Sequence, residues 1–254
     1  MVVVAGASVG VLGGLIGLGG AEFRLPLLIG VFGFTALHAV ILNKAMSLVV
    51  VLTALPVRLV NIPFEDVRPH WRAVVWLLSG SLLAAWLGAS AATRMRAPTL
   101  YRVLGVLLFA IAVVLVVTHI GDVDGLGVTG APRVVLAVIA GFGIGLVAAV
   151  MGVAGGELLI PTIVLLYGTD AKVAGSLSLM VSLPTMVVAF TRYSRDGSFV
   201  VLRDHRRFAL TMAVASIAGT IVGGLAAGVV PEAVLIPLLG GLLLVSAVHV
   251  WRQA

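Results

Sequence analysis

Long apolar runs constrain this chain more than any other feature of its sequence. The longest, residues 134–167, contains one charged side chain, Glu157. A helix needs about 20 mainly apolar residues to cross the ~30 Å hydrocarbon core of a bilayer. Charged residues make up only 10% of the chain, whereas soluble domains carry about 25%. The sequence therefore predicts an all-α integral membrane protein that crosses the bilayer several times.

The chain is an internal duplication. Glu22 and Glu157 lie 135 positions apart (157 minus 22), and each follows a glycine cluster and precedes a proline by four residues. Other residues match at the same offset without a gap, including Pro26 with Pro161, Arg68 with Arg203, His70 with His205 and Arg72 with Arg207. Duplicated halves are typical of transporters. We predict a first repeat at 1–119, a linker at 120–132 and a second repeat at 133–254, together forming one transmembrane domain.

Each repeat contains four apolar segments, which predicts about eight membrane-spanning helices in two tandem four-helix repeats. The segments cover 2–34, 36–60, 71–93 and 100–118, and then 134–167, 171–190, 208–230 and 234–251. The first segment of each repeat is too long for one straight span, and a glycine cluster and a proline interrupt it. We expect a broken or re-entrant helix there. Because unpaired backbone is costly in lipid, each break must face protein or a water-filled cavity.

Arginines between the apolar segments indicate topology, since cytoplasmic loops are enriched in Lys and Arg. Residues 58–72 and 192–207 both carry several arginines. If both stretches are cytoplasmic, an even number of spans separates them and the repeats run parallel, which is the arrangement we favour. The alternative is inverted repeats, which follow if each broken segment is a complete re-entrant hairpin. Positive charge in residues 94–102 weighs against the parallel arrangement.

The glycine clusters are the first candidates for a ligand site. Glycine adopts positive φ readily and lets the backbone approach a ligand closely. A helix that restarts after such a break points free N–H groups into the gap, and these favour an anion. The glycines expected to line the site are Gly19, Gly20, Gly155 and Gly156. Close helix packing better explains most other glycines, such as Gly88 and Gly223.

Glu22 and Glu157 are costly in apolar segments, which argues for a working site. They can stabilise the restarting helices, because a carboxylate near a helix N-terminus is favourable. They are also candidates for proton coupling. A third role is structural pairing of Glu22 with Arg24 or Lys44, but Leu159 stands where the second repeat would need its arginine. Capping is the baseline role and proton coupling the second, and the sequence leaves both open.

Polar residues near the first break complete the candidate substrate site. Lys44 lies inside the second apolar segment beside Asn43, and the matching positions hold Ser178 and Leu179. A lysine there either snorkels to the interface or faces a cavity, and its depth favours the cavity. With Arg24 it would bias the first repeat towards a negative ligand, while Asn43 and Ser178 could donate hydrogen bonds. Weaker candidates are Ser47, Ser176 and Ser182.

Several function classes are not expected. The chain has no cysteine, which excludes disulfides and thiolate metal sites. Its histidines lack metal-ligand spacing and no nucleophile–base grouping is present, so we predict no enzyme, catalytic residue, metal or cofactor. The net charge of +6 reflects positive loops rather than nucleic-acid binding. The repeated Arg-x-His-x-Arg pattern is expected to anchor the third segment of each repeat at the cytoplasmic interface.

The duplicated motif resembles that of a known family. The segment Gly17-Leu18-Gly19-Gly20-Ala21-Glu22 with Pro26, and its counterpart at 152–161, are similar to the motif of the TauE/SafE family, also called the sulfonate uptake permease family. The resemblance covers essentially the whole chain. It implies a bacterial inner-membrane carrier of sulfite, sulfonates or related sulfur anions with its site at the paired broken helices. The usual third glycine is Ala21 in the first copy, and Ala154 interrupts the second.

The resulting hypothesis is a multi-pass secondary transporter in the bacterial inner membrane. Its substrate would be a small sulfur-containing anion: sulfite, sulfoacetate or a related organosulfonate. We favour export, because an inside-negative potential drives an anion outward by about 2.3 kcal/mol per charge per 100 mV. The alternatives are a proton-coupled anion uptake permease, a channel-like anion pore and a membrane assembly protein without transport activity. The partners are then the anion, the lipid bilayer and coupling protons, with homo-oligomerisation left open.

Overall fold

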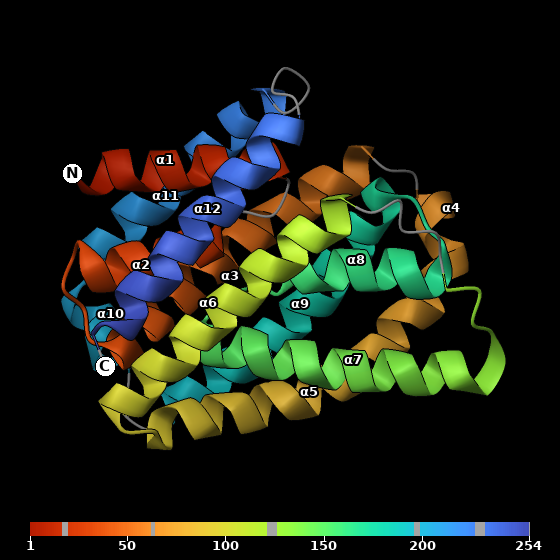
Figure 1. The fold of residues 1–254 in the computed structure, drawn as a ribbon, viewed down its shortest axis with the longest axis horizontal. Coiled ribbons are helices and arrows are strands. Elements are labelled where there is room, and N and C mark those ends of the chain that lie inside the picture. Colours follow the sequence, from red (N-terminus) through yellow and green to blue (C-terminus); the bar gives the residue numbers. More distant parts are fainter. Residues whose placement is uncertain (17–19, 62–63, 121–125, 196–198, 227–231, 254) are drawn as a thin grey trace.

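The computed structural model describes residues 1–16, 20–61, 64–120, 126–195, 199–226 and 232–253. Every regular element in these ranges is helical, as the apolar runs predict (Figure 1). The first half contains α1 (Val2–Ile16), α2 (Ala21–Gly30), α3 (Ala36–Asn61), α4 (Phe64–Val67), a 3-10 turn at Arg68–His70, α5 (Trp71–Arg94) and α6 (Ala97–Ile120). The second half contains α7 (Gly130–Met151), α8 (Gly156–Tyr167), α9 (Ala171–Ser194), α10 (Val200–Asp204), α11 (Arg206–Ala226) and α12 (Glu232–Trp251).

Among the described residues, five stretches are helical, long and apolar enough to cross a membrane. They are Ala36–Thr53, Arg68–Arg94, Ala97–Val114, Gly130–Met151 and Val173–Ser194. Shorter apolar helices occur at Val2–Leu15, Gly156–Tyr167 and Gly240–Trp251. The all-helical, membrane-protein class is therefore confirmed, while the full count of eight spans stays a prediction.

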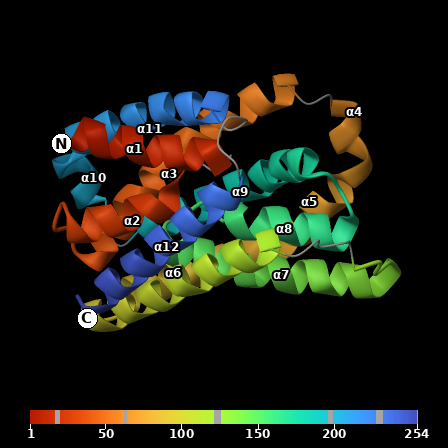
Figure 2. The same cartoon turned by 45° about the horizontal axis from the view of Figure 1, so that its top comes forward.

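Both predicted helix breaks fall on the glycine clusters. α1 ends at Ile16 and α2 begins at Ala21, whereas α7 ends at Met151 and α8 begins at Gly156. Gly155 precedes α8 with φ 83°, and Gly20 precedes α2 with φ 69°, a left-handed conformation that side chains disfavour. After each break the chain folds back, so α2 lies beside α1 and α8 beside α7 (Figures 1 and 2).

The two hairpins enter the helical body from opposite ends. The N-terminus, the end of α2 and α10 lie together at the left of Figures 1 and 2, whereas the start of α7, the end of α8 and α4 lie at the right. Helices α3, α5 and α6 run between these ends, as do α9, α11 and α12. After the first hairpin, three helices cross the body, so the chain begins its second half at the opposite end. The second repeat is therefore inverted relative to the first.

The favoured parallel arrangement is therefore wrong, and the inverted alternative describes the observed fold. The physical reason is that each break closes a complete hairpin and does not merely bend one span. We expected the stretches 58–72 and 192–207 on one side, but the helices described within them, α4 and α10, lie towards opposite ends.

Positive charge is concentrated at the end that holds the two termini. The residues there, at the ends of α5, α9 and α12 and around α6, α10 and α11, are Arg94, Arg96, Arg102, Arg192, Arg195, Arg203, Arg206, Arg207 and Arg252. At the other end Arg68, Arg72 and Arg133 are balanced in part by Glu65 and Asp170.

The halves interlock through glycine faces that match at the 135-residue offset. The first helix of each hairpin packs against a long helix of the other half, α1 on α11 and α7 on α5. A Cβ added at Gly10 would lie 2.2 Å from the Ser216 carbonyl oxygen, and one at Gly145 would lie 2.6 Å from that of Ser81. Similar close approaches at Gly88 and Gly223 confirm the packing role expected for them.

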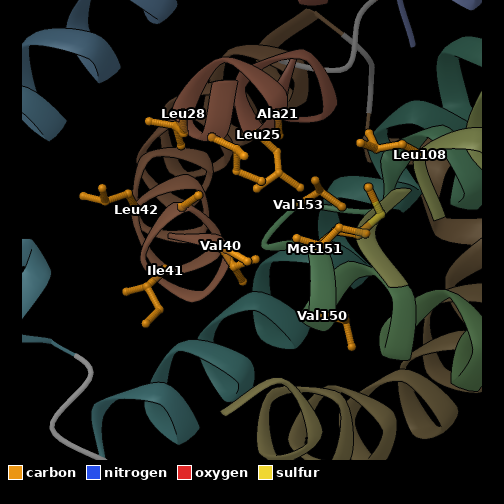
Figure 3. Packing of buried hydrophobic residues seen from close by; sticks show 14 of the residues in the cluster. Ala21, Leu25, Leu28, Val40, Ile41, Leu42, Leu108, Val150, Met151 and Val153 are labelled. Atoms are coloured by element: carbon orange, nitrogen blue, oxygen red, sulfur yellow. The ribbon is translucent and has the colours of Figure 1, made fainter. Parts of the chain in front are cut away.

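A buried apolar cluster surrounds the two breaks. Figure 3 shows Leu25 of α2 and Val40 of α3 on the side towards Met151 and Val153 at the second break, with Leu28 farther away on α2. All five side chains are almost fully buried. The second break and the start of α2 therefore lie inside protein, as the cost of exposing unpaired backbone to lipid requires.

Candidate functional site

The two breaks bring together Glu22 and Glu157, one from each repeat. Glu22 is only 2% exposed, and both carboxylate oxygens of Glu157 are sealed from solvent. The two carboxyl groups lie close enough to interact electrostatically. Two carboxylates have no donor between them, so a proton on one is needed to bond the pair. Without that proton, Oε1 of Glu22 and both Glu157 oxygens have no partner among the described residues.

Both glutamates lie in the first turn of a restarting helix. Glu22 is the second residue of α2 and Glu157 the second residue of α8. The residues that precede these helices, Gly20 and Gly155, have no side chain with which to cap the first N–H groups. A negative charge is favourable there because the helix N-terminus carries partial positive charge. The expected capping role therefore fits both copies.

Arg24 and Asn43 form a polar bridge beside the first break. Arg24 Nη1 donates to Asn43 Oδ1 at 3.4 Å and to Ser47 Oγ at 3.3 Å. Asn43 Nδ2 in turn donates to the Ala21 carbonyl at 3.0 Å and to the Met151 carbonyl at 3.5 Å. Asn43 thus links the backbone beside the first break to the backbone beside the second break. The guanidinium of Arg24 also interacts electrostatically with the Glu22 carboxylate.

Lys44 binds the backbone of the second break. Its side chain is fully buried, and Nζ donates to the carbonyl oxygens of Ala148 at 2.8 Å and Val153 at 2.7 Å. Tyr193 donates its hydroxyl to the neighbouring Ala149 carbonyl at 2.9 Å. The last carbonyls of a helix carry partial negative charge and lack intrahelical donors. Lys44 therefore does not snorkel to the interface but stabilises the end of α7.

The second repeat has no equivalent of the arginine bridge. Leu159 stands where Arg24 stands in the first repeat, and it packs in an apolar cluster. Ser178, the counterpart of Asn43, donates to the Gly175 carbonyl of its own helix at 2.8 Å. Ser182, the counterpart of Ser47, is buried and has no hydrogen-bond partner among the described residues. The backbone at the two breaks is thus arranged pseudo-symmetrically, whereas the charged side chains beside the breaks differ between the two repeats.

The structure brings most of the predicted site residues to the two breaks. Gly20, Glu22, Arg24, Asn43, Lys44, Gly155, Gly156 and Glu157 lie at the breaks or bond to residues that flank them. Gly19 lies outside the described residues. Tyr193 was missed, because a tyrosine 44 positions from its partner carbonyl has no local sequence signal.

Comparison with known proteins identifies the family. The family model for the sulfite exporter TauE/SafE matches residues 2–250. The chain therefore belongs to this family of membrane transporters, as its duplicated motif indicates. No curated protein and no solved structure matches it.

Proposed function

We propose that this TauE/SafE family member is a secondary transporter that exports a small sulfur-containing anion across the bacterial inner membrane. Sulfite, sulfoacetate and related organosulfonates are the substrate class. One observation supports this most directly: two glycine-led helix N-termini, contributed by opposite repeats, meet at a buried polar centre. Discontinuous helices at the interface of inverted repeats form the binding sites of many secondary transporters.

The centre has the chemistry to hold an anion. Free N–H groups at the starts of α2 and α8 favour negative charge. The cations Arg24 and Lys44 lie in the same region and balance Glu22 and Glu157 in formal charge. One proton on the glutamate pair leaves the four side chains with a net charge of +1, which suits a monoanion. We therefore place the substrate between the two breaks, with Gly20, Arg24, Asn43, Gly155 and Ser178 among its contacts.

Lys44 has a mainly architectural part in this scheme. Two of its three donors bind carbonyls at the second break. Its positive charge still contributes to the field at the centre, because electrostatic interactions fall off slowly where water is excluded. Arg24 is the closer candidate for direct substrate contact.

The asymmetric arginines suggest an orientation. Cytoplasmic loops carry an excess of Lys and Arg, so the arginine-rich end with both termini would face the cytoplasm. The first hairpin, α1 and α2, would then enter the membrane from the cytoplasmic side, and the second hairpin, α7 and α8, from the periplasmic side. We propose two inverted repeats, at 1–119 and 133–254, each with one re-entrant hairpin followed by three membrane-spanning helices, joined by a linker at 120–132.

Energetics favour export without a coupling ion. An inside-negative potential drives a monoanion outward by about 2.3 kcal/mol per 100 mV. Uptake would work against this force and would need a cation, for which a proton on the Glu22–Glu157 pair is the candidate. The polar centre is sealed from solvent, with Glu22, Arg24, Asn43 and Lys44 each at most 2% exposed. That closure supports a carrier, which occludes its substrate, over an open pore.

Flux into proteoliposomes tests this proposal. Radiolabelled sulfite and sulfoacetate are loaded on one side, with a membrane potential or a pH gradient imposed separately. We expect flux that follows the potential at a carrier's turnover, and loss of most of it in Arg24→Leu. Loss of pH-driven flux in Glu22→Gln and Glu157→Gln would identify proton coupling, with Glu65→Gln as the exposed control.

Two results would contradict the proposal. Conductance far above carrier turnover in planar bilayers would indicate a channel. Absence of flux and of ligand stabilisation across a panel of sulfur oxyanions would instead indicate a protein without transport activity. If both glutamine variants retain pH-driven flux, proton carriage by the pair is excluded while export remains.

A further inference from the structure

A cavity lies at the end of the molecule opposite the arginine-rich end. It has a volume of about 740 Å³ and opens between the starts of α5 and α7 and the end of α8. Its polar and aromatic lining side chains are His70, Trp71, Arg72, Trp76, Arg133 and Tyr167. No aspartate or glutamate occurs among its lining residues. A second, smaller cavity shares Arg72 and adds Arg68 and Glu65.

Arg133 is held in place within this cavity. Its Nε donates to the Val128 carbonyl at 2.6 Å, and its guanidinium lies 5.3 Å from the centroid of the Tyr167 ring. These contacts orient the planar group, and an oriented guanidinium matches the geometry of an oxyanion. The Tyr167 hydroxyl is sealed from solvent and has no hydrogen-bond partner among the described residues. Arg133 therefore places an oriented cation at the cavity, whereas the Tyr167 hydroxyl, which is sealed from solvent, does not open into it.

One free helix N-terminus lies at the same place. α7 starts after Thr129, which does not cap the helix with a side-chain hydrogen bond, and Arg133 lies in its first turn. α5 instead continues from the 3-10 turn at Arg68–His70, and the Trp71 N–H donates to the Arg68 carbonyl oxygen. The partial positive charge at the start of α7 thus adds to that of Arg72 and Arg133, which both line the cavity.

In the second repeat, aromatic side chains pack around the residues that correspond to this cavity. Arg203, His205 and Arg207 repeat the pattern of Arg68, His70 and Arg72 at the other end of the molecule. There Phe208 packs edge-on against Phe32 at 4.9 Å and Phe34 at 5.3 Å, and His205 packs on Phe34.

The matching position in the first repeat holds a much smaller residue. Ala73 is the counterpart of Phe208, and Tyr167 is the counterpart of Phe32. Ala73 borders the cavity and is itself fully buried, so the first repeat has no aromatic ring at this position. The same sequence pattern is therefore filled by aromatic packing at one end and left open, with an added arginine, at the other.

We propose that this cavity is an oxyanion-binding site, distinct from the central one, in which Arg72 and Arg133 hold a tetrahedral anionic group. The group is either a free sulfur oxyanion or the phosphate of an anionic phospholipid. Trp71 and Trp76 are 55% and 36% exposed, and tryptophans of this kind are common at the level of lipid headgroups. The inference depends on the end cavity and not on which anion the protein transports.

Two variants test the site in the full-length protein. Ala73→Phe places beside the cavity the ring that the second repeat uses at this position and leaves every charge in place; because Ala73 is fully buried, the arginine variant tests the site independently of packing. Arg72→Gln with Arg133→Gln removes the cations. The matched control, Arg203→Gln with Arg207→Gln, removes the same charge from the filled copy of the pattern.

Two probes distinguish the source of the anion. Sulfate binding is measured by isothermal titration in detergent, and retention of phosphatidylglycerol over phosphatidylcholine is measured by native mass spectrometry. We expect both test variants to weaken one of these about tenfold or more, because charge-assisted hydrogen bonds are lost or blocked. The control and wild type should bind equally.

Each outcome decides the proposal. Selective loss of sulfate binding identifies a free oxyanion, and selective loss of phosphatidylglycerol identifies a lipid headgroup. Either supports the site, and neither depends on flux through the centre. If wild type binds neither probe, or if Ala73→Phe and the arginine variant bind as wild type does, the proposal is wrong.

Discussion

Gly141→Ala should separate α5 from α7 and destabilise the protein. A Cβ at Gly141 would lie 2.1 Å from the Leu77 carbonyl oxygen and 2.9 Å from the Leu77 Cα. An ordinary contact begins near 3.4 Å, so the two backbones must move apart by about 1 Å. Overpacking of this kind costs about 1–3 kcal/mol, and we expect the upper part of that range because backbone atoms cannot rotate away.

Two other glycines calibrate this prediction. Gly143 lies two positions along the same helix, and nothing lies within 4 Å of a Cβ placed there. Gly143→Ala should therefore be neutral or stabilising by up to about 1 kcal/mol through helix propensity. Gly6 is the counterpart of Gly141, and its added Cβ would lie 2.8 Å from the Met212 carbonyl oxygen. Gly6→Ala should fall between the other two.

Unfolding in dodecyl maltoside, followed by tryptophan fluorescence, measures the three midpoints against wild type. The order expected, from most to least destabilised, is Gly141→Ala, Gly6→Ala, Gly143→Ala. If Gly141→Ala is as stable as Gly143→Ala, the backbones of α5 and α7 do not approach as described. The interlocking of the two halves would then be refuted.

Further substitutions test the centre. Lys44→Met should destabilise the protein by about 2–4 kcal/mol, because it removes two charge-assisted hydrogen bonds to buried carbonyls. Leu179→Met at the matched position should stay within about 1.5 kcal/mol of wild type. Chemical unfolding compares the two variants, and equal midpoints would remove the stabilising role of Lys44 at the end of α7. Arg24→Leu, which copies Leu159, should abolish stabilisation by sulfite in a thermal-shift assay, and unchanged stabilisation would exclude contact between Arg24 and the anion. Glu157→Gln replaces a charge with an amide of the same size, so flux driven by membrane potential should persist while any pH-driven flux falls. If potential-driven flux falls as severely as in Arg24→Leu, Glu157 does not serve proton coupling alone.

Local patterns in the sequence were sufficient for much of the fold. The apolar runs predicted helices, and the offset between Glu22 and Glu157 predicted two related halves. The breaks were predicted at the correct glycines because positive φ is a local requirement that glycine meets at little cost. The pairing of the two breaks was implied by the resemblance to the TauE/SafE family rather than by the residues themselves.

The direction of the repeats did not follow from the sequence. A glycine cluster can bend a helix or reverse it, and packing against another helix decides which. The arginine pattern was ambiguous because 58–72, 94–102 and 192–207 all carry positive charge. Only the folded positions show that two of these stretches lie at one end and the third lies towards the other.

The sequence likewise did not predict which groups the buried polar side chains bond to. Lys44 was expected to face a cavity, yet it bonds carbonyls 104 and 109 positions away. Ala73 and Phe208 occupy matching positions, and only the structure shows that one leaves a cavity where the other fills it.

By itself the sequence determined that the protein is a duplicated, helical membrane protein whose helices break beside two glutamates. Hydrophobicity, periodicity and glycine's conformational freedom act over a few residues, so they can be read along the chain. The tertiary structure decided that the hairpins enter from opposite ends and that Lys44 stabilises the end of α7. These features depend on contacts between residues more than 100 positions apart, where burial and hydrogen-bond satisfaction in three dimensions determine the outcome.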